Sequence, residues 1–407
     1  MEMKLDYSDI HFEENGKLKL LIIVGTRPEI IRLSATINKC RKYFDTVLAH
    51  TGQNYDYNLN EPICYPYEGT PCDSSVLTKE NFQQYTGLAP GNNFDYKRFN
   101  PKYFQHLEKC ITDLMDLQIQ ADIIVMHPYD RWGFSEMPED CDNLYWNYLI
   151  SRLSAYRNVW WSLANEYDLM KKKTLTDWEH YASILCQKDV YCHLRSIHNC
   201  MPLYDFSRPW ITHCSIQRQD AYLSAELTDL WRTQYKKPVV LDEIAYEGNI
   251  QHEWGDISGK ELTRRFWEAA CRGGYATHGE TYLSPDNILW WSHGGVLHGE
   301  SPERIKFLKE ILEETPGIGL MPMKTIRGEV AAQVEETASG STGYYLYYYG
   351  LHRPSFRDYY FDDDHQYCVE IIDTWNMIIT QVGVFQGKFR VNLPGIEYMA
   401  VRIRRQN

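Results

Sequence analysis

Short apolar runs alternate with helix-like segments along most of this 407-residue chain. Eight runs of strand length can be read, at residues 18–26, 45–52, 121–130, 159–166, 194–199, 210–217, 238–243 and 274–282. Between most of them the apolar residues recur at spacings of three and four, as they do in amphipathic helices. Because strands that alternate with helices form parallel sheets, the pattern predicts an α/β fold.

Polar residues near the ends of these runs favour one α/β architecture. Six of them fall near the carboxyl ends of predicted strands: His127, Glu166, His198, His213, Glu243 and Glu280. In a (β/α)8 TIM barrel that edge carries the chemistry, and a doubly wound open sheet is the alternative. We therefore predict a barrel whose long loop, from Asn60 to Asn100, covers the same edge.

The pattern changes after about Thr315. Runs at residues 343–350, 367–375, 387–394 and 398–405 alternate with period two and are separated by turn residues. This spacing predicts a small C-terminal all-β sandwich over residues 315–407. Its expected role is structural support, and a carbohydrate-facing role is the alternative.

Charge and composition exclude several functional classes. The net charge of −13, without a basic stripe, argues against nucleic-acid binding. No run reaches the roughly 20 apolar residues of a membrane span, and the start lacks the apolar segment of a signal peptide. Eleven scattered cysteines without a C-x-x-C pair favour free thiols, so we expect a cytoplasmic protein. The oligomeric state stays open.

Two of the predicted strands end on glutamate, at Glu166 in "VWWSLANE" and at Glu243 in "KPVVLDE". A lone carboxylate is costly to bury, so Glu166 must be solvated, paired or protonated, as at a barrel mouth. The fourth and seventh strands lie across that mouth from each other. Cleaving a glycosidic bond with retention needs two carboxyl groups roughly 5–5.5 Å apart. The pattern therefore favours a glycosidase.

Other residues near these strand ends are candidates for the site. Asp242 and Glu247 compete with Glu243 as nucleophile, but strand alternation turns Asp242 to the other face, and Glu247 lies beyond the strand. The candidates for substrate binding are His127, Trp132, His198, His213, Tyr246, Glu280 and Trp290. Ordinary packing or a structural hydrogen bond is the alternative role of each ring.

Several stretches resemble the bacterial apiosidase-like glycosidases of clan A. The resemblance runs from about Tyr55 to the end, through "HPYDRWGF", "YRNVWWSLANEYDLM", "PVVLDEIAYEGN", "GGYATHGETYL" and "YYGLHRPSFRDYYFDDD". It implies a TIM-barrel hydrolase of carbohydrate metabolism, followed by a small β domain. It also implies Glu166 as acid/base, Glu243 as nucleophile, and Asn165 as a donor to the sugar hydroxyl next to the reacting carbon.

Residues 1–60 resemble a different family. "KLKLLIIVGTRPEIIRLSATINKC" is similar to the start of UDP-N-acetylglucosamine 2-epimerases, which implies UDP-sugar contacts at Gly25, Thr26 and Arg27. The rest of that enzyme has no counterpart here, so we expect a chimeric chain, the product of a gene fusion. A β-α-β unit from either parent makes the same right-handed crossover. Residues 1–60 would then complete the barrel of residues 61–314.

Two rivals to an active glycosidase stay open. One is a UDP-sugar-binding, epimerase-like protein, and the other is a non-catalytic carbohydrate-binding barrel. Because residues 1–60 replace the first strands of a typical relative, side chains that those strands normally place in the pocket are missing. We therefore expect reduced or absent hydrolysis. We expect no cofactor and no metal, because no phosphate loop, dinucleotide fingerprint or zinc-spaced Cys/His group is present.

Overall fold

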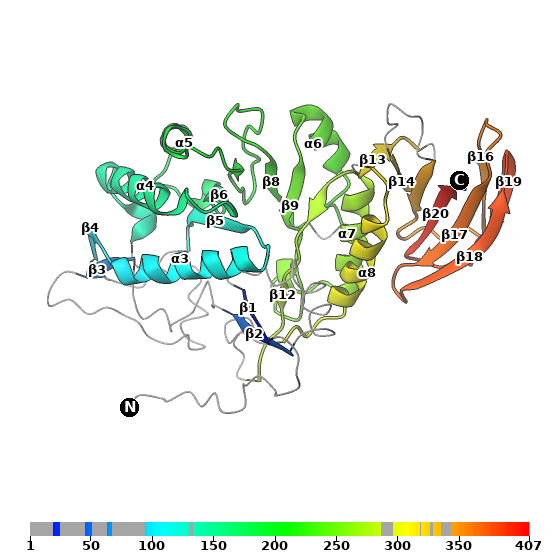
Figure 1. Cartoon of the computed structure of the whole chain (residues 1–407), viewed down its shortest axis with the longest axis horizontal. Helices are drawn as coiled ribbons and strands as arrows, with labels where there is room; N and C mark the ends of the chain where they lie inside the picture. The colour runs from blue at the N-terminus through cyan, green and yellow to red at the C-terminus, as the bar shows by residue number, and fades with distance from the viewer. Residues whose placement is uncertain are drawn as a thin grey trace. The chain divides into compact units, whose positions relative to one another are not determined.

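The computed structural model describes residues 19–24, 45–50, 63–66, 94–129, 133–220, 222–285, 296–317, 319–325, 329–334 and 343–406. The chain forms two compact units (Figure 1). The first holds Met1–Ser215 with Thr281–Val296, and the second holds Ile216–Glu280 with Leu297–Asn407. Within the described residues, no helix combines the length and the apolar character that crossing a bilayer requires.

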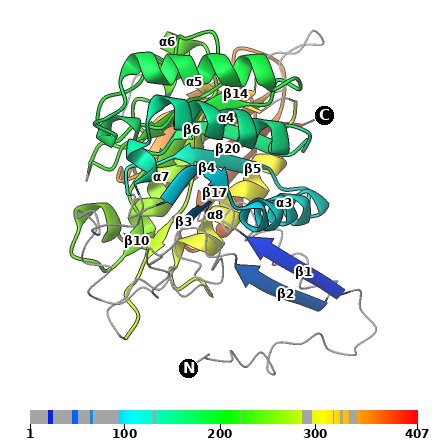
Figure 2. The same ribbon diagram turned by 90° about the vertical axis from the view of Figure 1, so that its left-hand side faces the viewer.

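The first unit begins with two small sheets. Strands β1 (Lys19–Val24) and β2 (Asp45–His50) are parallel and in register from Lys19 opposite Asp45 to Val24 opposite His50 (Figure 2). Both predicted strands are therefore confirmed. Strands β3 (Cys64–Pro66) and β4 (Phe94–Phe99) pair antiparallel, so the prediction of one continuous loop from Asn60 to Asn100 is wrong at its two ends.

Alternating strands and helices follow in the first unit. They are α3 (Pro101–Asp116), β5 (Ala121–Met126), α4 (Glu139–Leu153), β6 (Val159–Ala164), α5 (Leu175–Lys188) and β7 (Arg195–Ser196), with short 3-10 turns at Phe134–Glu136 and Tyr167–Leu169. β5, β6 and β7 form a parallel sheet in chain order. Thr174 precedes α5 as its N-cap: its hydroxyl accepts the Asp177 N–H, and the Asp177 carboxylate accepts the Thr174 N–H. The three helices and β6 each contribute buried apolar residues, such as Phe104, Trp146, Trp161 and Leu185.

The second unit continues the same alternation. β8 (Cys214–Gln217), which begins in the first unit, is followed by α6 (Thr228–Tyr235), β9 (Val239–Glu243), α7 (Gly259–Cys271), β11 (Tyr275–Ala276) and α8 (Ser301–Glu313). The strand order is β8-β9-β11. A 3-10 turn spans Glu253–Gly255, and β10 (Glu247–Gly248) pairs with β12 (Glu280–Thr281) beyond this sheet.

These sheets confirm the predicted α/β fold. The parallel strands of the described residues pair as β1-β2, β5-β6-β7 and β8-β9-β11, and an isolated parallel bridge joins His198 to Ser215. Each sheet keeps the order of the chain, which is the arrangement that strand-helix-strand crossovers produce. Closure of the strands into one barrel stays a prediction.

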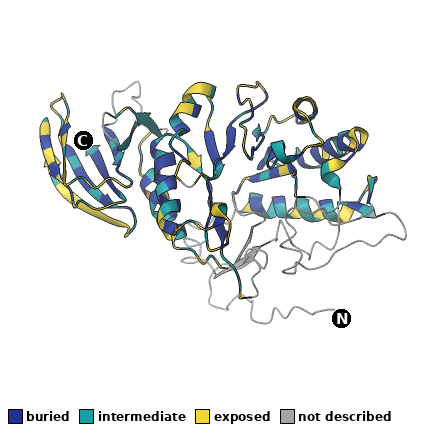
Figure 3. Ribbon diagram, turned by 180° about the vertical axis from the view of Figure 1, so that it is seen from behind, coloured by how far each residue is buried: buried dark blue, intermediate teal, exposed yellow. Residues whose placement is uncertain are grey.

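The C-terminal region is all β, as predicted, and the strands of its sheets pair antiparallel. A six-stranded sheet has the order β13 (Leu320–Met323), β14 (Val330–Val334), β15 (Tyr344–Tyr348), β20 (Met399–Arg405), β17 (Tyr367–Asp373) and β18 (Ile378–Phe385), and a second sheet pairs β16 (Phe356–Tyr360) with β19 (Lys388–Asn392). One hydrophobic core contains side chains of both sheets, among them Tyr359, Val369, Val391 and Ile403. Along β15, buried and partly buried residues alternate, and the partly buried Tyr345 and Tyr347 pack against this core. Figure 3 shows buried and exposed residues on the strands of the C-terminal region.

A buried ion network lies within this region. The Arg402 guanidinium, in a residue that is 2% exposed, donates to Glu370 at 2.7 Å and to Glu314 at 2.6 Å. Arg404 donates to the other oxygen of Glu370 at 2.8 Å. Removing one partner of a buried pair leaves an uncompensated charge, so Glu370 matters more here than a surface carboxylate would.

We predict that Glu370→Gln destabilises the protein by about 3 kcal/mol, because the buried Arg402 loses its buried counter-charge and keeps only Glu314, whose side chain is 54% exposed. The matched control is Asp358→Asn, whose partner Arg390 is 2.7 Å away on the exposed sheet face. The control should cost below about 1 kcal/mol. Urea denaturation followed by fluorescence measures both, and equal losses in the two variants would contradict the prediction.

Candidate active site

Glu166 lies two residues past the end of β6, on a turn that is hydrogen-bonded to the segments at the ends of β5 and β7. The N–H of Asn165 donates to the carbonyl of Met126 at the end of β5, at 2.9 Å. The N–H of Tyr167 donates to the carbonyl of His198, just beyond β7, also at 2.9 Å. Glu166 itself has φ 48° and ψ 56°, a left-handed conformation that costs an L-residue roughly 1–2 kcal/mol. Backbone strain of this kind clusters at functional sites.

The carboxylate of Glu166 is surrounded by donors. Its residue is 5% exposed, the Tyr129 hydroxyl donates to Oε2, and the Asn165 side-chain amide lies 3.3 Å from the same oxygen. Two donors on one oxygen orient the carboxyl group and leave Oε1 outside these two contacts. The turn therefore presents a positioned carboxyl group at the carboxyl edge of the β5-β6-β7 sheet.

The three predicted histidines take different positions. His127 directly follows β5, and His198 follows β7, with its ring Nδ1 3.4 Å from the Ser215 hydroxyl. His213 precedes β8, so its predicted place at the carboxyl end of a strand is wrong. Its ring packs on Trp160, near the start of β6, with the ring centroids 5.4 Å apart. The apolar run begins four residues before the strand itself, and this misplaced the histidine.

Glu243 is the last residue of β9, as predicted. The Gln219 side-chain amide donates to its Oε2 at 2.9 Å, and the Arg218 N–H donates to its carbonyl at 2.8 Å. Both donors come from the loop after β8. The carboxyl end of β9 is thus tied to that loop, and the carboxylate is only partly buried.

Glu247 and Glu280 are buried more deeply than Glu243. Glu280 is 3% exposed and accepts the N–H groups of His298 at 2.8 Å and Gly299 at 3.0 Å. Burial, together with the neighbouring Glu247 charge, raises the pKa of the Glu280 carboxyl to about 7. Glu247 is 1% exposed and accepts the N–H groups of Glu300 and Ser301 at the start of α8. These contacts make Glu247 a weaker candidate for the nucleophile than Glu243.

Tyr246 packs closely against protein. It is 5% exposed, and its ring meets the edge of Trp254 with centroids 6.1 Å apart. A Cβ added to Gly279 would lie 2.2 Å from the ring, so glycine there lets the backbone lie against Tyr246. Trp132 and Trp290, the other predicted aromatic candidates, lie outside the described residues.

Sequence reasoning missed three side chains at these strand ends. Tyr129 contacts Glu166, Gln219 contacts Glu243, and His278 lies 3.6 Å from Glu280. Each stands within three residues of a strand end or of a predicted site residue. A search of those short loops for polar residues would have found them. Glu166 belongs to the first unit and Glu243 to the second, so the separation of their carboxyl groups stays a prediction.

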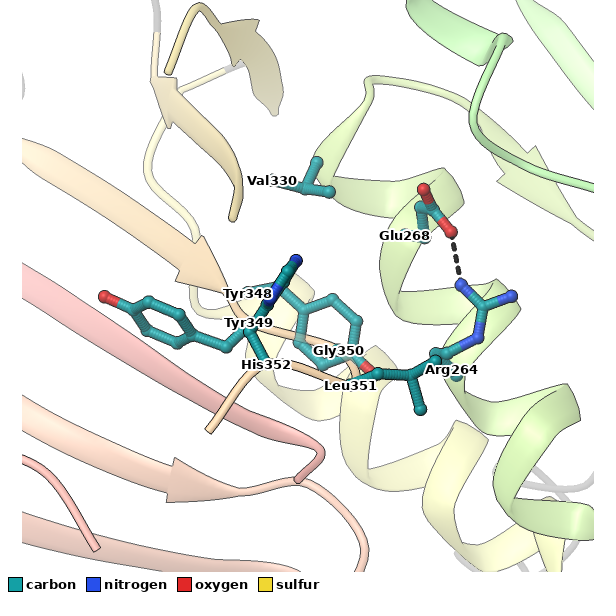
Figure 4. Close-up of a pocket in the computed structure, with 8 residues that line it drawn as sticks. All are labelled: Arg264, Glu268, Val330, Tyr348, Tyr349, Gly350, Leu351 and His352. Atoms are coloured by element: carbon teal, nitrogen blue, oxygen red, sulfur yellow. Dashed lines mark hydrogen bonds and ion pairs between the residues drawn. The ribbon is translucent and has the colours of Figure 1, made fainter. Parts of the chain in front are cut away.

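A pocket elsewhere in the second unit has a different character. It holds about 150 Å³ and is lined by Arg264, Glu268, Val330 and residues 348–352 (Figure 4). Arg264 donates to Glu268 at 2.6 Å, and Arg272 donates to the other oxygen of that carboxylate. Because its one carboxylate is paired with two guanidinium groups, this pocket does not supply a catalytic pair.

We predict that Gly279→Ala destabilises the protein by roughly 1–3 kcal/mol, because the new methyl group overlaps the Tyr246 ring. Tyr246→Leu introduced into the Gly279→Ala protein should recover part of the loss, since the smaller side chain makes room. Thermal denaturation of the two single variants and the double variant measures this coupling. Strictly additive effects would show that the two positions do not clash.

Comparisons with known proteins match the two parts of the chain separately. The sequence model of the family described as "Apiosidase-like, catalytic domain" matches residues 41–316, and that of a domain of unknown function, DUF5605, matches residues 333–404. The first match begins upstream of Tyr55, where the resembling motifs of the sequence begin. A curated UDP-N-acetylglucosamine 2-epimerase homolog from Methanococcus maripaludis is 36% identical over 44 residues, which are 11% of this chain and 12% of that protein.

Solved structures agree with the family match. A Bacteroides vulgatus ATCC 8482 protein assigned to the glycoside hydrolases is 35% identical, with a TM-score of 0.71 over 77% of this chain. The present chain covers 65% of that protein's chain. A family 5 glycoside hydrolase from the same organism is 14% identical, with a TM-score of 0.59, and the match covers 96% of this chain and 90% of that one, which shows a shared fold. The chain belongs to the apiosidase-like family.

Proposed function

We propose that the protein is a retaining glycoside hydrolase with Glu166 and Glu243 as its catalytic pair. One observation carries the proposal. Both glutamates lie inside the matched apiosidase-like domain, each at the carboxyl end of a parallel strand. We further propose that the eight parallel strands close into a TIM barrel, in which the fourth and seventh strands face each other across the mouth.

The mechanism assigns one role to each carboxyl group. Glu243 attacks the anomeric carbon while Glu166 protonates the leaving oxygen, which gives a glycosyl-enzyme ester and a free alcohol. Glu166 then takes a proton from water, and the hydroxide displaces Glu243 to release the sugar. The pair must lie about 5–5.5 Å apart for this chemistry.

The neighbours of each glutamate fit these roles. The Tyr129 hydroxyl and the Asn165 amide hold one oxygen of Glu166, so its proton would sit on a defined side. Gln219 donates to Glu243 and would fix the attacking oxygen in the same way. We propose that the substrate hydroxyls meet Asn165, the three histidines and Glu280, with Trp132, Tyr246 and Trp290 as ring contacts.

We keep the division into residues 1–60, 61–314 and 315–407 as a proposal, with the first segment completing the barrel. The nine described cysteines are free, which supports a location in the cytoplasm. The short match to an epimerase homolog supports a second candidate function, UDP-sugar binding. In that reading the "GTRPE" turn would hold the phosphates near Gly25 and Arg27.

We predict that Glu166→Gln lowers kcat on unactivated glycosides by roughly 10² to 10⁴-fold, because no group then protonates the leaving oxygen. An aryl glycoside with a good leaving group should lose far less in its first step, which a burst of phenol release reports. Glu243→Gln should abolish turnover of both substrates. Asp242→Asn is the matched control and should keep turnover, and a larger loss there than in Glu243→Gln would move the nucleophile to Asp242.

We predict that residues 1–60 limit the rate of glycoside hydrolysis. The full-length protein should hydrolyse a panel of chromogenic glycosides slowly, because the first two strands lack the pocket side chains of a typical relative. Fast hydrolysis would refute this prediction.

Calorimetry with UDP tests the second candidate function, UDP-sugar binding. A heat of binding that is seen in the wild type and abolished by Arg27→Ala would support UDP-sugar recognition.

A further inference from the structure

Three titratable side chains of the second unit, which the proposed mechanism does not use as acid or nucleophile, converge on one point. Glu247 comes from β10, Glu280 from β12, and His278 from the two-residue approach to β12. One ligand atom of each lies within 4.8 Å of the others, and His278 Nε2 is 3.6 Å from Glu280 Oε1. The pairing of β10 with β12 brings these distant parts of the chain together.

His278 has no hydrogen-bond partner that accounts for its burial. The residue is 1% exposed, and within the described part of the chain neither ring nitrogen makes a hydrogen bond. An unsatisfied buried polar group costs roughly 1–3 kcal/mol, so packing alone would favour an apolar side chain at this position. The ring instead directs Nε2 toward the Glu280 carboxylate. A histidine nitrogen beside a carboxylate is an arrangement in which both groups can bind one metal ion.

The two glutamates are held in place from behind. Glu280 accepts two backbone N–H groups from residues 298–299, and Glu247 accepts two from residues 300–301 and the Ser301 hydroxyl. A carboxylate has about four lone-pair sites, so these bonds leave capacity for a cation. Donors of this kind orient the ligands of metal sites.

Gly299 allows the two carboxylates to approach the same point. A Cβ there would lie 2.4 Å from Glu247 Oε2 and 2.7 Å from Glu280 Oε1. Two buried carboxylates side by side repel each other unless a proton or a cation lies between them. Glycine at position 299 thus leaves room for two carboxylate oxygens to lie close together, beside an imidazole that makes no hydrogen bond to the described residues.

We infer that Glu247, His278 and Glu280 bind one divalent transition-metal cation. Imidazole with two carboxylates suits Mn²⁺, Fe²⁺ or Zn²⁺, whereas Ca²⁺ takes six to eight oxygen ligands and Mg²⁺ prefers oxygen ligands and water. The cation would tie β10 and β12 to the first turn of α8. Because Glu280 is also proposed to meet the substrate, the tests below measure cation binding and thermal stability and not hydrolysis.

Titration of untagged, EDTA-treated full-length protein with Mn²⁺ tests the site, because Mn²⁺ avoids the thiols that complicate Zn²⁺. Electron paramagnetic resonance of free Mn²⁺ should show one ion bound per chain in the wild type. His278→Gln and Glu280→Gln should each lose at least tenfold in affinity. His365→Gln, which changes a histidine of the loop after β16, should bind as the wild type does.

Thermal denaturation gives a second readout. Added Mn²⁺ should raise Tm in the wild type and in His365→Gln, by mass action, and leave the Tm of the two site variants unchanged. Circular dichroism of the metal-free proteins checks that each variant folds, and Glu280→Gln carries the test if His278→Gln does not. A wild type that binds no Mn²⁺, or a His278→Gln variant that binds it equally well, would overturn the inference and leave a carboxyl pair that shares a proton.

Discussion

The turn after β6 depends on two backbone hydrogen bonds, one to β5 and one to the segment after β7. They hold Asn165 and Tyr167 on either side of Glu166, whose backbone has the left-handed conformation. A side chain on a loose loop could swing toward solvent. Here the parallel sheet itself aims the carboxyl group, and the catalytic proposal depends on that aim.

The second unit buries several charged side chains. Arg402 is compensated by Glu370 and Glu314, and Arg265 donates to Glu261 and to the carbonyls of Ile244 and Asp220. Each of these groups has its partners in place. The Glu247, His278 and Glu280 cluster stands apart because its imidazole remains unpaired and two like charges adjoin. Because the buried arginines of the same unit have their partners, the lack of a hydrogen bond at His278 within the described chain supports a ligand at this cluster.

Periodicity in the sequence predicted the strands well, because apolar runs of strand length must be buried. Glu166 and Glu243 followed from this, since each closes such a run. His213 was misplaced because its apolar run extends four residues ahead of the hydrogen-bonded strand. The pairing of Glu247 with Glu280 could not be predicted, because it depends on a two-residue bridge between β10 and β12 that leaves no periodic signal. The spacing of this cluster matches no common ligand motif, so the expectation of no metal was formed without it and stays a prediction beside the inferred site.

The left-handed backbone at Glu166 places stability and chemistry in opposition at one residue. Glycine or asparagine tolerates that conformation better than glutamate does, so either would relax the turn and remove the carboxyl group. If Glu166 is the acid/base that we propose, selection for hydrolysis would retain a residue that selection for stability alone would replace. If a lineage lost its substrate, this position would be among the first to drift, and its identity would record whether the ancestral chemistry is still in use.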